Sequence, residues 1–205
     1  MMQSFLNLSE RIQSLEQQEN VVATINSTVI SGSNAILALE PLLAGKRQLL
    51  LVTDSNIVGL DAVTQIRNLL ANDGRHVALI DNVPAEPGHH DVSALLKNVQ
   101  DLNVEMVIGI GGGSVLDVAK LLSVLCHPES PTLDAMLAGE KPLQRVASVL
   151  IPATAGTGSE ATPNAILAIP EQNTKVGIIS PVLLPDFVAL LPELTTSMPA
   201  HIASS

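Results

Sequence analysis

The stretch GIGGGSVLDVAK, residues 109–120, decides the fold of this chain. An apolar run, residues 106–108, precedes it, and apolar residues at helical spacing follow it as far as Leu125. This is the order of a strand, a glycine turn and a helix. Glycines let a ligand approach the backbone closely, and the first turn of a helix presents unpaired N–H groups to a phosphate. The stretch therefore predicts a nucleotide-phosphate site, with a plain tight turn as the alternative.

Strand and helix patterns alternate on both sides of this stretch. Strands are expected at residues 28–30, 48–53, 76–81, 106–110 and 146–152, and helices at residues 36–43, 58–71, 91–102 and 118–125. A β-hairpin is expected at residues 165–169 and 175–179, followed by proline-rich, short irregular pieces. The connections are long enough for crossovers, so the pattern predicts an α/β fold with a doubly wound, Rossmann-like parallel sheet and a β-hairpin.

The chain divides into three expected parts. Residues 1–27 form a polar extension with a helix at residues 9–18, and residues 28–192 form a dinucleotide-binding α/β domain. Residues 193–205 are expected to begin a connection to a further domain.

Composition excludes several classes of protein. The 205 residues are 46% hydrophobic but only 1% aromatic, as expected for a core of aliphatic strands buried on both faces. The formal net charge of −10 argues against a nucleic-acid partner. No apolar run is long enough for a membrane helix, and the first residues lack a signal-peptide pattern. The single cysteine, Cys126, excludes an intrachain disulfide and predicts a reducing, cytoplasmic location.

Polar residues near the strand ends are candidates for ligand contacts. Asp54 follows a strand, where it either accepts ribose hydroxyls or caps the next helix. Ser114 and Asp117 lie in the first turn after the glycines, and Asp117 is suited to orienting a hydroxyl. Lys120 is expected to be solvated. The loop at residues 154–160 offers hydroxyl and amide donors to a ligand, or is an ordinary connection.

Histidine and cysteine give no further site. The five histidines lack metal-ligand spacing, and Cys126 is expected to be a small buried hydrophobic residue.

Three collinear motifs carry a family resemblance: GGGSVLDVAK at residues 111–120, PATAGTGSEAT at 152–162 and KVGIISPVLLPD at 175–186. Together they resemble the iron-containing (group III) alcohol dehydrogenase family, from about Thr28 onward. The resemblance implies a nucleotide-binding domain followed by an all-helical domain that supplies the metal ligands, one Asp and three His. On this resemblance the helical domain and its ligands for Fe²⁺ or Zn²⁺ are absent from this chain.

The resemblance also implies a set of cofactor-binding residues and no catalytic residue in this chain. Asp54 matches the acidic residue beside the adenosine ribose, which favours NAD over NADP, and Lys175 matches a lysine near a cofactor ribose. The remaining matches are Gly112, Gly113, Ser114 and Asp117 at the pyrophosphate turn and its helix, Thr154, Gly156 and Thr157 in a second cofactor loop, and Ile166 at an apolar contact.

The implied function is the cofactor-binding part of a metal-dependent alcohol dehydrogenase. The full-length enzyme would transfer hydride between a small alcohol or aldehyde and NAD(P), as a homo-oligomer, a dimer or larger, while this chain alone would be inactive. A catalytically inert nucleotide-binding fragment is one alternative, and a dehydroquinate-synthase-like lyase, dependent on NAD and metal, is another. Glu86 stands where the family has Asn, which predicts a negative charge near the cofactor.

Overall fold

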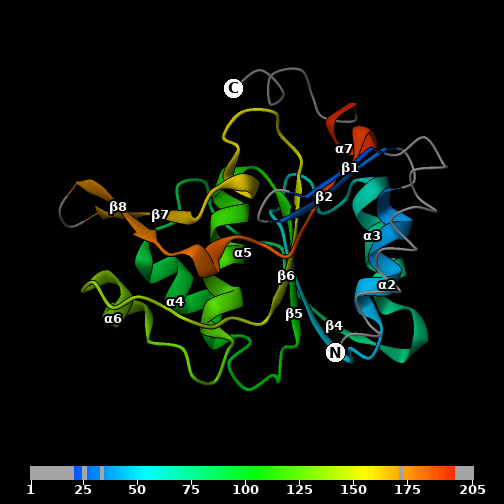
Figure 1. Ribbon diagram of the computed structural model, residues 1–205. Coiled ribbons are helices and arrows are strands. Elements are labelled where there is room, and N and C mark those ends of the chain that lie inside the picture. Colours follow the sequence, from blue (N-terminus) through cyan, green and yellow to red (C-terminus); the bar gives the residue numbers. More distant parts are fainter. Residues whose placement is uncertain (1–20, 25–26, 33–34, 171–172, 197–205) are drawn as a thin grey trace.

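A seven-stranded sheet runs through the centre of the molecule (Figure 1). The computed structural model describes residues 21–24, 27–32, 35–170 and 173–196. In spatial order the strands are β1 (Val21–Thr24), β2 (Thr28–Ser31), β9 (Phe187–Leu190), β6 (Ala147–Pro152), β5 (Met106–Gly111), β3 (Gln48–Val52) and β4 (His76–Ile80). β1 is antiparallel to β2, and every later neighbouring pair is parallel.

The predicted hairpin lies outside this sheet as a separate antiparallel pair. It consists of β7 (Asn164–Ile169) and β8 (Thr174–Ile179). The predicted α/β fold, with a doubly wound parallel sheet and a hairpin, is thereby confirmed.

Helices cover both faces of the sheet (Figure 1). One face packs against η1 (Ala35–Leu39), α2 (Glu40–Leu43), α3 (Asp61–Ala71) and α7 (Pro192–Thr196). The other packs against α4 (His89–Lys97), α5 (Gly113–Leu125), α6 (Leu133–Leu137) and the hairpin. Short 3₁₀ turns complete the described chain: η2 (Asn72–Gly74), η3 (Ser159–Ala161) and η5 (Pro181–Leu183).

The continuous apolar run of β3 contributes buried side chains to the helical layers on both faces of the sheet. Successive side chains of a strand point to opposite faces. Leu49 and Leu51 therefore join the α3 layer, whereas Leu50 and Val52 join the α5 layer. All four are fully buried, which explains why this strand reads as an uninterrupted apolar segment.

Two glycines of β5 let helix α5 lie close against the sheet. A Cβ added to Gly109 would stand 2.6 Å from the Cβ of Ala119, and one added to Gly111 would stand 2.6 Å from that of Val115. Neither approach is compatible with a side chain. These glycines are required by helix–strand packing, and this brings the start of α5 to the carboxyl end of β5.

The proline-rich end of the chain contains a strand that the sequence pattern did not predict. The expectation of irregular pieces is wrong for Phe187–Leu190, which form β9 between β2 and β6. Four residues between prolines are too few to display a periodicity. Their strand conformation depends instead on hydrogen bonding to neighbours that lie far away in the sequence.

The expected domain boundaries shift at both ends. The sheet begins with β1, before residue 28, so part of the expected extension belongs to the sheet. At the other end Leu194 of α7 is fully buried in the α3 layer, so the domain continues past residue 192. The helix expected at residues 9–18 and the segment 197–205 lie outside the described residues.

Several helix limits also differ from the expected ones. The helix expected at 36–43 is divided into η1 and α2, and α3 begins at Asp61 instead of residue 58. α4 begins earlier than expected and ends at Lys97. Its start is fixed by the side chain of Asp91, which accepts a hydrogen bond of 2.8 Å from the Gly88 amide and so caps the helix.

The chain changes direction within the sheet between β3 and β5. From β3 it proceeds to the edge strand β4, and from β5 it proceeds the other way to β6. Ligands of open α/β sheets bind at such a switch point, outside the carboxyl ends of the strands. A ligand site is therefore expected in the crevice between the ends of β3 and β5.

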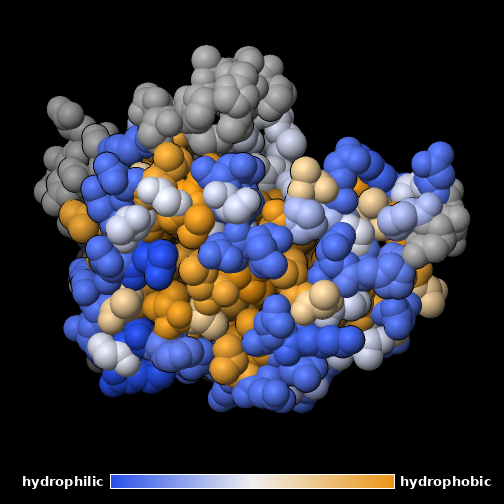
Figure 2. Space-filling model, turned by 180° about the vertical axis from the view of Figure 1, so that it is seen from behind, coloured by the Kyte–Doolittle hydropathy of each residue, from blue (hydrophilic) through white to orange (hydrophobic). Residues whose placement is uncertain are grey.

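Apolar residues reach the surface as well as the core. Figure 2 shows an apolar area in the middle of the face opposite to the view of Figure 1, surrounded by hydrophilic residues. None of the helices in the described part of the chain combines the length and the apolar character needed to cross a membrane.

Candidate functional site

Two cavities flank the N-terminus of α5. The smaller one, of about 190 Å³, lies in the crevice between the ends of β3 and β5, and the larger one, of about 320 Å³, lies between α5 and the hairpin. Gly113 and Ser114, in the first turn of α5, line both. The first N–H groups of a helix have no intrahelical acceptor and carry the positive end of its dipole. The two cavities thus meet at a position suited to an anion.

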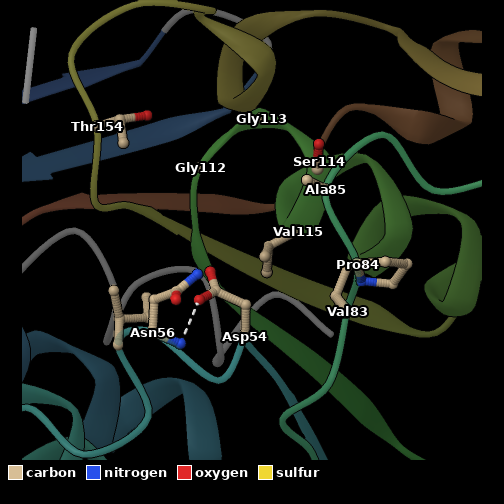
Figure 3. Close-up of a pocket in the computed structure, with 11 residues that line it drawn as sticks. Asp54, Asn56, Val83, Pro84, Ala85, Gly112, Gly113, Ser114, Val115 and Thr154 are labelled. Atoms are coloured by element: carbon tan, nitrogen blue, oxygen red, sulfur yellow. Dashed lines mark hydrogen bonds between the residues drawn. The ribbon is translucent and has the colours of Figure 1, made fainter. Parts of the chain in front are cut away.

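Asp54, for which the sequence leaves a ribose contact or a helix cap open, lines the smaller cavity. Asp54 directly follows Thr53 at the end of β3, and its Oδ1 accepts a hydrogen bond of 2.8 Å from the Asn56 amide (Figure 3). The helix-cap alternative is wrong, because α3 begins later and its cap residue is Leu60. Asp54 instead closes a local turn, and this turn holds its half-buried carboxylate at the cavity.

The glycine turn before α5 lies between the two cavities. Gly112 has an extended backbone and precedes α5. A Cβ added to Gly113 would stand 2.8 Å from the Thr157 side chain, so this position is closed to a larger residue unless the loop moves. The turn and the loop after β6 therefore fit against each other.

The loop after β6 contributes to both cavities. Thr154 lines the smaller cavity opposite Asp54 (Figure 3). Thr157 lines the larger cavity. Gly156 lies exposed between them and lines neither. The structure thus brings the two threonines to the site and leaves the glycine as part of their connection.

Asp117 lies one turn further into α5 than the sequence suggested, at the base of the larger cavity. Its Oδ2 accepts a hydrogen bond of 3.0 Å from the Ile166 amide, and its Oδ1 accepts one from the Ser159 hydroxyl. An ionised carboxylate has about four acceptor positions. Asp117 therefore ties α5 to both the η3 loop and the hairpin while lining the cavity.

Lys120 is fully buried, and the expectation that it is solvated is wrong. Its Nζ lies 2.9 Å from Oδ1 of Asp117 and donates to the Ser159 carbonyl, also at 2.9 Å. It also donates to Thr162 and to the carbonyl of Asn164. Burial lowers the pKa of Lys120 from its ordinary value, and the neighbouring Asp117 carboxylate opposes that change.

The hairpin supplies the outer wall of the larger cavity. Ile166 lines it with a side chain that is 45% exposed, which fits an apolar contact with a ligand. Lys175 lines it from β8, and its Nζ lies 2.7 Å from Oε1 of Glu86. The negative charge expected at Glu86 is thus paired, and the Lys175 ammonium holds the pKa of the Glu86 carboxyl below its usual value.

Some lining residues were not singled out from the sequence. They include Asn56, Ile57, Val83, Pro84 and Ala85 in the smaller cavity and Thr162, Asn164 and Ala168 in the larger one. These residues are brought in by loops and by the hairpin. One signal was available for Lys120, because a helix that is apolar on all sides is buried, and a lysine within it needs internal partners.

Within the described part of the chain, no three His, Cys, Asp or Glu side chains gather as a metal ion would require. His201 lies outside that part. Cys126 is half-buried, and burial raises the pKa of its thiol to about 11.

Comparison with known proteins identifies the family. Residues 26–192 match the family model of iron-containing alcohol dehydrogenases, and the chain belongs to this family. It is 32% identical over 164 residues to long-chain-alcohol dehydrogenase 1 of Geobacillus thermodenitrificans, covering 78% of this chain and 41% of that protein. The chain thus spans less than half the length of this relative.

Solved structures agree with the fold. An iron-containing alcohol dehydrogenase from Thermotoga maritima superposes with a TM-score of 0.75 at 28% identity, covering 89% of this chain and 51% of that one. Sulfoacetaldehyde reductase from Bifidobacterium kashiwanohense, solved in complex with NAD⁺, superposes with a TM-score of 0.76 at 23% identity, covering 87% and 48%.

Proposed function

We propose that this chain binds NAD across the N-terminus of α5, as the cofactor-binding part of a metal-dependent alcohol dehydrogenase. The observation that carries the proposal is the pair of cavities that share Gly113 and Ser114. A dinucleotide consists of two nucleoside halves joined by a pyrophosphate. The two cavities and the helix N-terminus between them match this arrangement.

The residues present suit each part of the cofactor. The pyrophosphate takes the N–H groups at the start of α5, where Gly112 and Gly113 carry no side chain to obstruct it. The adenosine half lies toward Asp54, and the nicotinamide half lies toward Asp117 and Ile166. Bound NAD supplies a hydride acceptor, while this chain binds and orients it.

Relatives support this function and leave the substrate open. Their names include a long-chain-alcohol dehydrogenase, a choline dehydrogenase and a sulfoacetaldehyde reductase, the last represented by a structure with NAD⁺. We propose a small alcohol or aldehyde as the substrate of the full enzyme. The described residues do not fit an Fe²⁺ or Zn²⁺ site, so the role proposed for this chain is cofactor binding. A cytoplasmic location and a homo-oligomeric state stay predictions.

Asp54 provides a test of cofactor orientation and preference. Its carboxylate accepts ribose hydroxyls but repels the 2′-phosphate of NADP. The Asp54→Gly variant is expected to lose most of the preference for NAD, measured as the ratio of the dissociation constants of NAD and NADP. An unchanged ratio contradicts the role of Asp54, and failure of the unaltered chain to bind either cofactor contradicts the proposed function.

Catalytic competence is a separate measurement. With NAD, Fe²⁺ or Zn²⁺ and a set of short alcohols, NADH formation by this chain is expected to be absent even where NAD binds. NAD binding without NADH formation supports the proposal that this chain binds the cofactor and that hydride transfer needs further residues. NADH formation by this chain contradicts the assignment of the chemistry to residues elsewhere.

A further inference from the structure

An ion pair stands at the rim of the larger cavity. Glu86 comes from the loop between β4 and α4, Lys175 comes from β8, and both line the cavity. Their charged atoms are 2.7 Å apart although the side chains are 70% and 54% exposed. The pair therefore bridges two separate walls of the proposed cofactor site.

The backbone fixes the position of Glu86. Its φ of +51° is in the left-handed region, which a residue with a long side chain rarely adopts. The next residues are attached to the hairpin, because the Pro87 carbonyl accepts a hydrogen bond of 3.0 Å from the Ala168 amide. Gly88 also forms a bridge with Ala168. The loop thus places the Glu86 carboxylate beside Lys175.

Lys175 is the one Lys or Arg among the described residues that line the two cavities. Its ammonium is therefore the side-chain cation at the site that can attract an anionic ligand. A carboxylate in contact with it leaves the pair with no net charge, and this weakens its attraction for a distant anion. Glu86 thereby controls the electrostatic contribution of Lys175.

We propose that Glu86 is an affinity-determining residue that acts through Lys175: it competes with the anionic part of the dinucleotide for the lysine ammonium. This inference rests on the proposed NAD-binding function. This competition makes NAD binding weaker than it would be if the Lys175 ammonium had no carboxylate partner. It also makes binding less sensitive to salt, because the rim of the site carries less net positive charge.

The test is titration of the full chain with NAD at several salt concentrations. Glu86→Gln removes the charge and keeps the shape, and it is expected to tighten NAD binding at low salt by about twofold to fivefold. The affinity of this variant is expected to fall more steeply with salt than that of the unaltered chain. Glu140→Gln, at an exposed carboxylate that lines neither cavity, makes the same charge change and is expected to have no effect.

A double-mutant cycle separates charge competition from a merely structural role. Lys175→Gln alone is expected to weaken NAD binding, because it leaves the Glu86 carboxylate at the rim without a counter-charge. In the Lys175→Gln background, Glu86→Gln is expected to tighten NAD binding less than it does in the unaltered chain, because no ammonium is released to the ligand. Additive effects of the two substitutions overturn the inference.

Backbone strain requires its own control. Asn tolerates positive φ better than Gln, so Glu86→Asn removes the charge and relaxes the loop. Both variants are expected to tighten binding, whereas tightening by Glu86→Asn alone attributes the gain to the backbone and overturns the inference. If the unaltered chain binds NAD but Glu86→Gln changes neither affinity nor salt dependence, only this inference fails. If the unaltered chain does not bind NAD, the proposed function fails with it.

Discussion

The buried ammonium of Lys120 and the carboxylate of Asp117, 2.9 Å apart on adjacent turns of α5, connect the core of the domain to the wall of the larger cavity. The same two side chains bond to the η3 loop and to the hairpin. The polar cluster therefore fixes three separate segments around the proposed cofactor site.

Loss of Lys120 is expected to destabilise the whole domain. Lys120→Met keeps the length of the side chain but leaves the mostly buried Asp117 carboxylate without its counter-ion, which costs about 3–5 kcal/mol. Urea unfolding measures this loss. Lys141→Met, at an exposed lysine, is expected to stay within about 0.5 kcal/mol of the unaltered chain.

A second substitution checks the cause of that loss. Asp117→Asn in the Lys120→Met background removes the unpaired charge and is expected to restore part of the stability. If Lys120→Met is as stable as Lys141→Met, the buried ion pair does not hold these segments together.

The glycines of β5 predict a contrast between two chemically identical substitutions. Gly109→Ala forces a Cβ to 2.6 Å from Ala119 and is expected to destabilise the domain by about 1–3 kcal/mol through overpacking. Gly59→Ala meets no atom within 4 Å and is expected to be near neutral. Equal thermal unfolding midpoints for the two variants contradict the close packing of α5 on β5.

Cys126 gives a prediction on pH dependence. Burial raises the pKa of its thiol from 9.0 to about 11, so at pH 8 the thiolate fraction is about 100-fold lower in the folded chain than in the unfolded one. Iodoacetamide alkylation is expected to be correspondingly slow in the native state and to increase toward pH 11. Addition of urea is expected to move the pH at which the alkylation rate is half-maximal, the midpoint, back toward 9. A native midpoint at or below 9 contradicts the burial of this thiol.

Local sequence patterns predict the strands and helices whose residues repeat at a regular spacing. The apolar run of β3 and the glycine turn before α5 follow from their own residues, so the layered fold and the position of this turn at the candidate site could be predicted. β9 could not be, because four residues between prolines show no periodicity and form a strand only when β2 and β6 flank them.

The candidate site was predicted where its residues follow strand ends. Asp54 and the threonines after β6 line the cavities because parallel strands bring their carboxyl ends to one edge. The partners of Lys120 and Glu86 were not predictable in this way. Each pairs with groups that the hairpin or the η3 loop brings in from beyond the local sequence, at separations of up to 89 positions.

Calorimetric titration with NAD tests the central claim most directly, using the unaltered chain beside Gly113→Val and Gly59→Ala. The Gly113→Val side chain collides with Thr157 at the junction of the two cavities, whereas Gly59 lines neither. The account predicts one NAD bound per chain, with binding retained by Gly59→Ala and lost by Gly113→Val. No binding by the unaltered chain, or equal binding by all three proteins, would contradict a cofactor site across the N-terminus of α5.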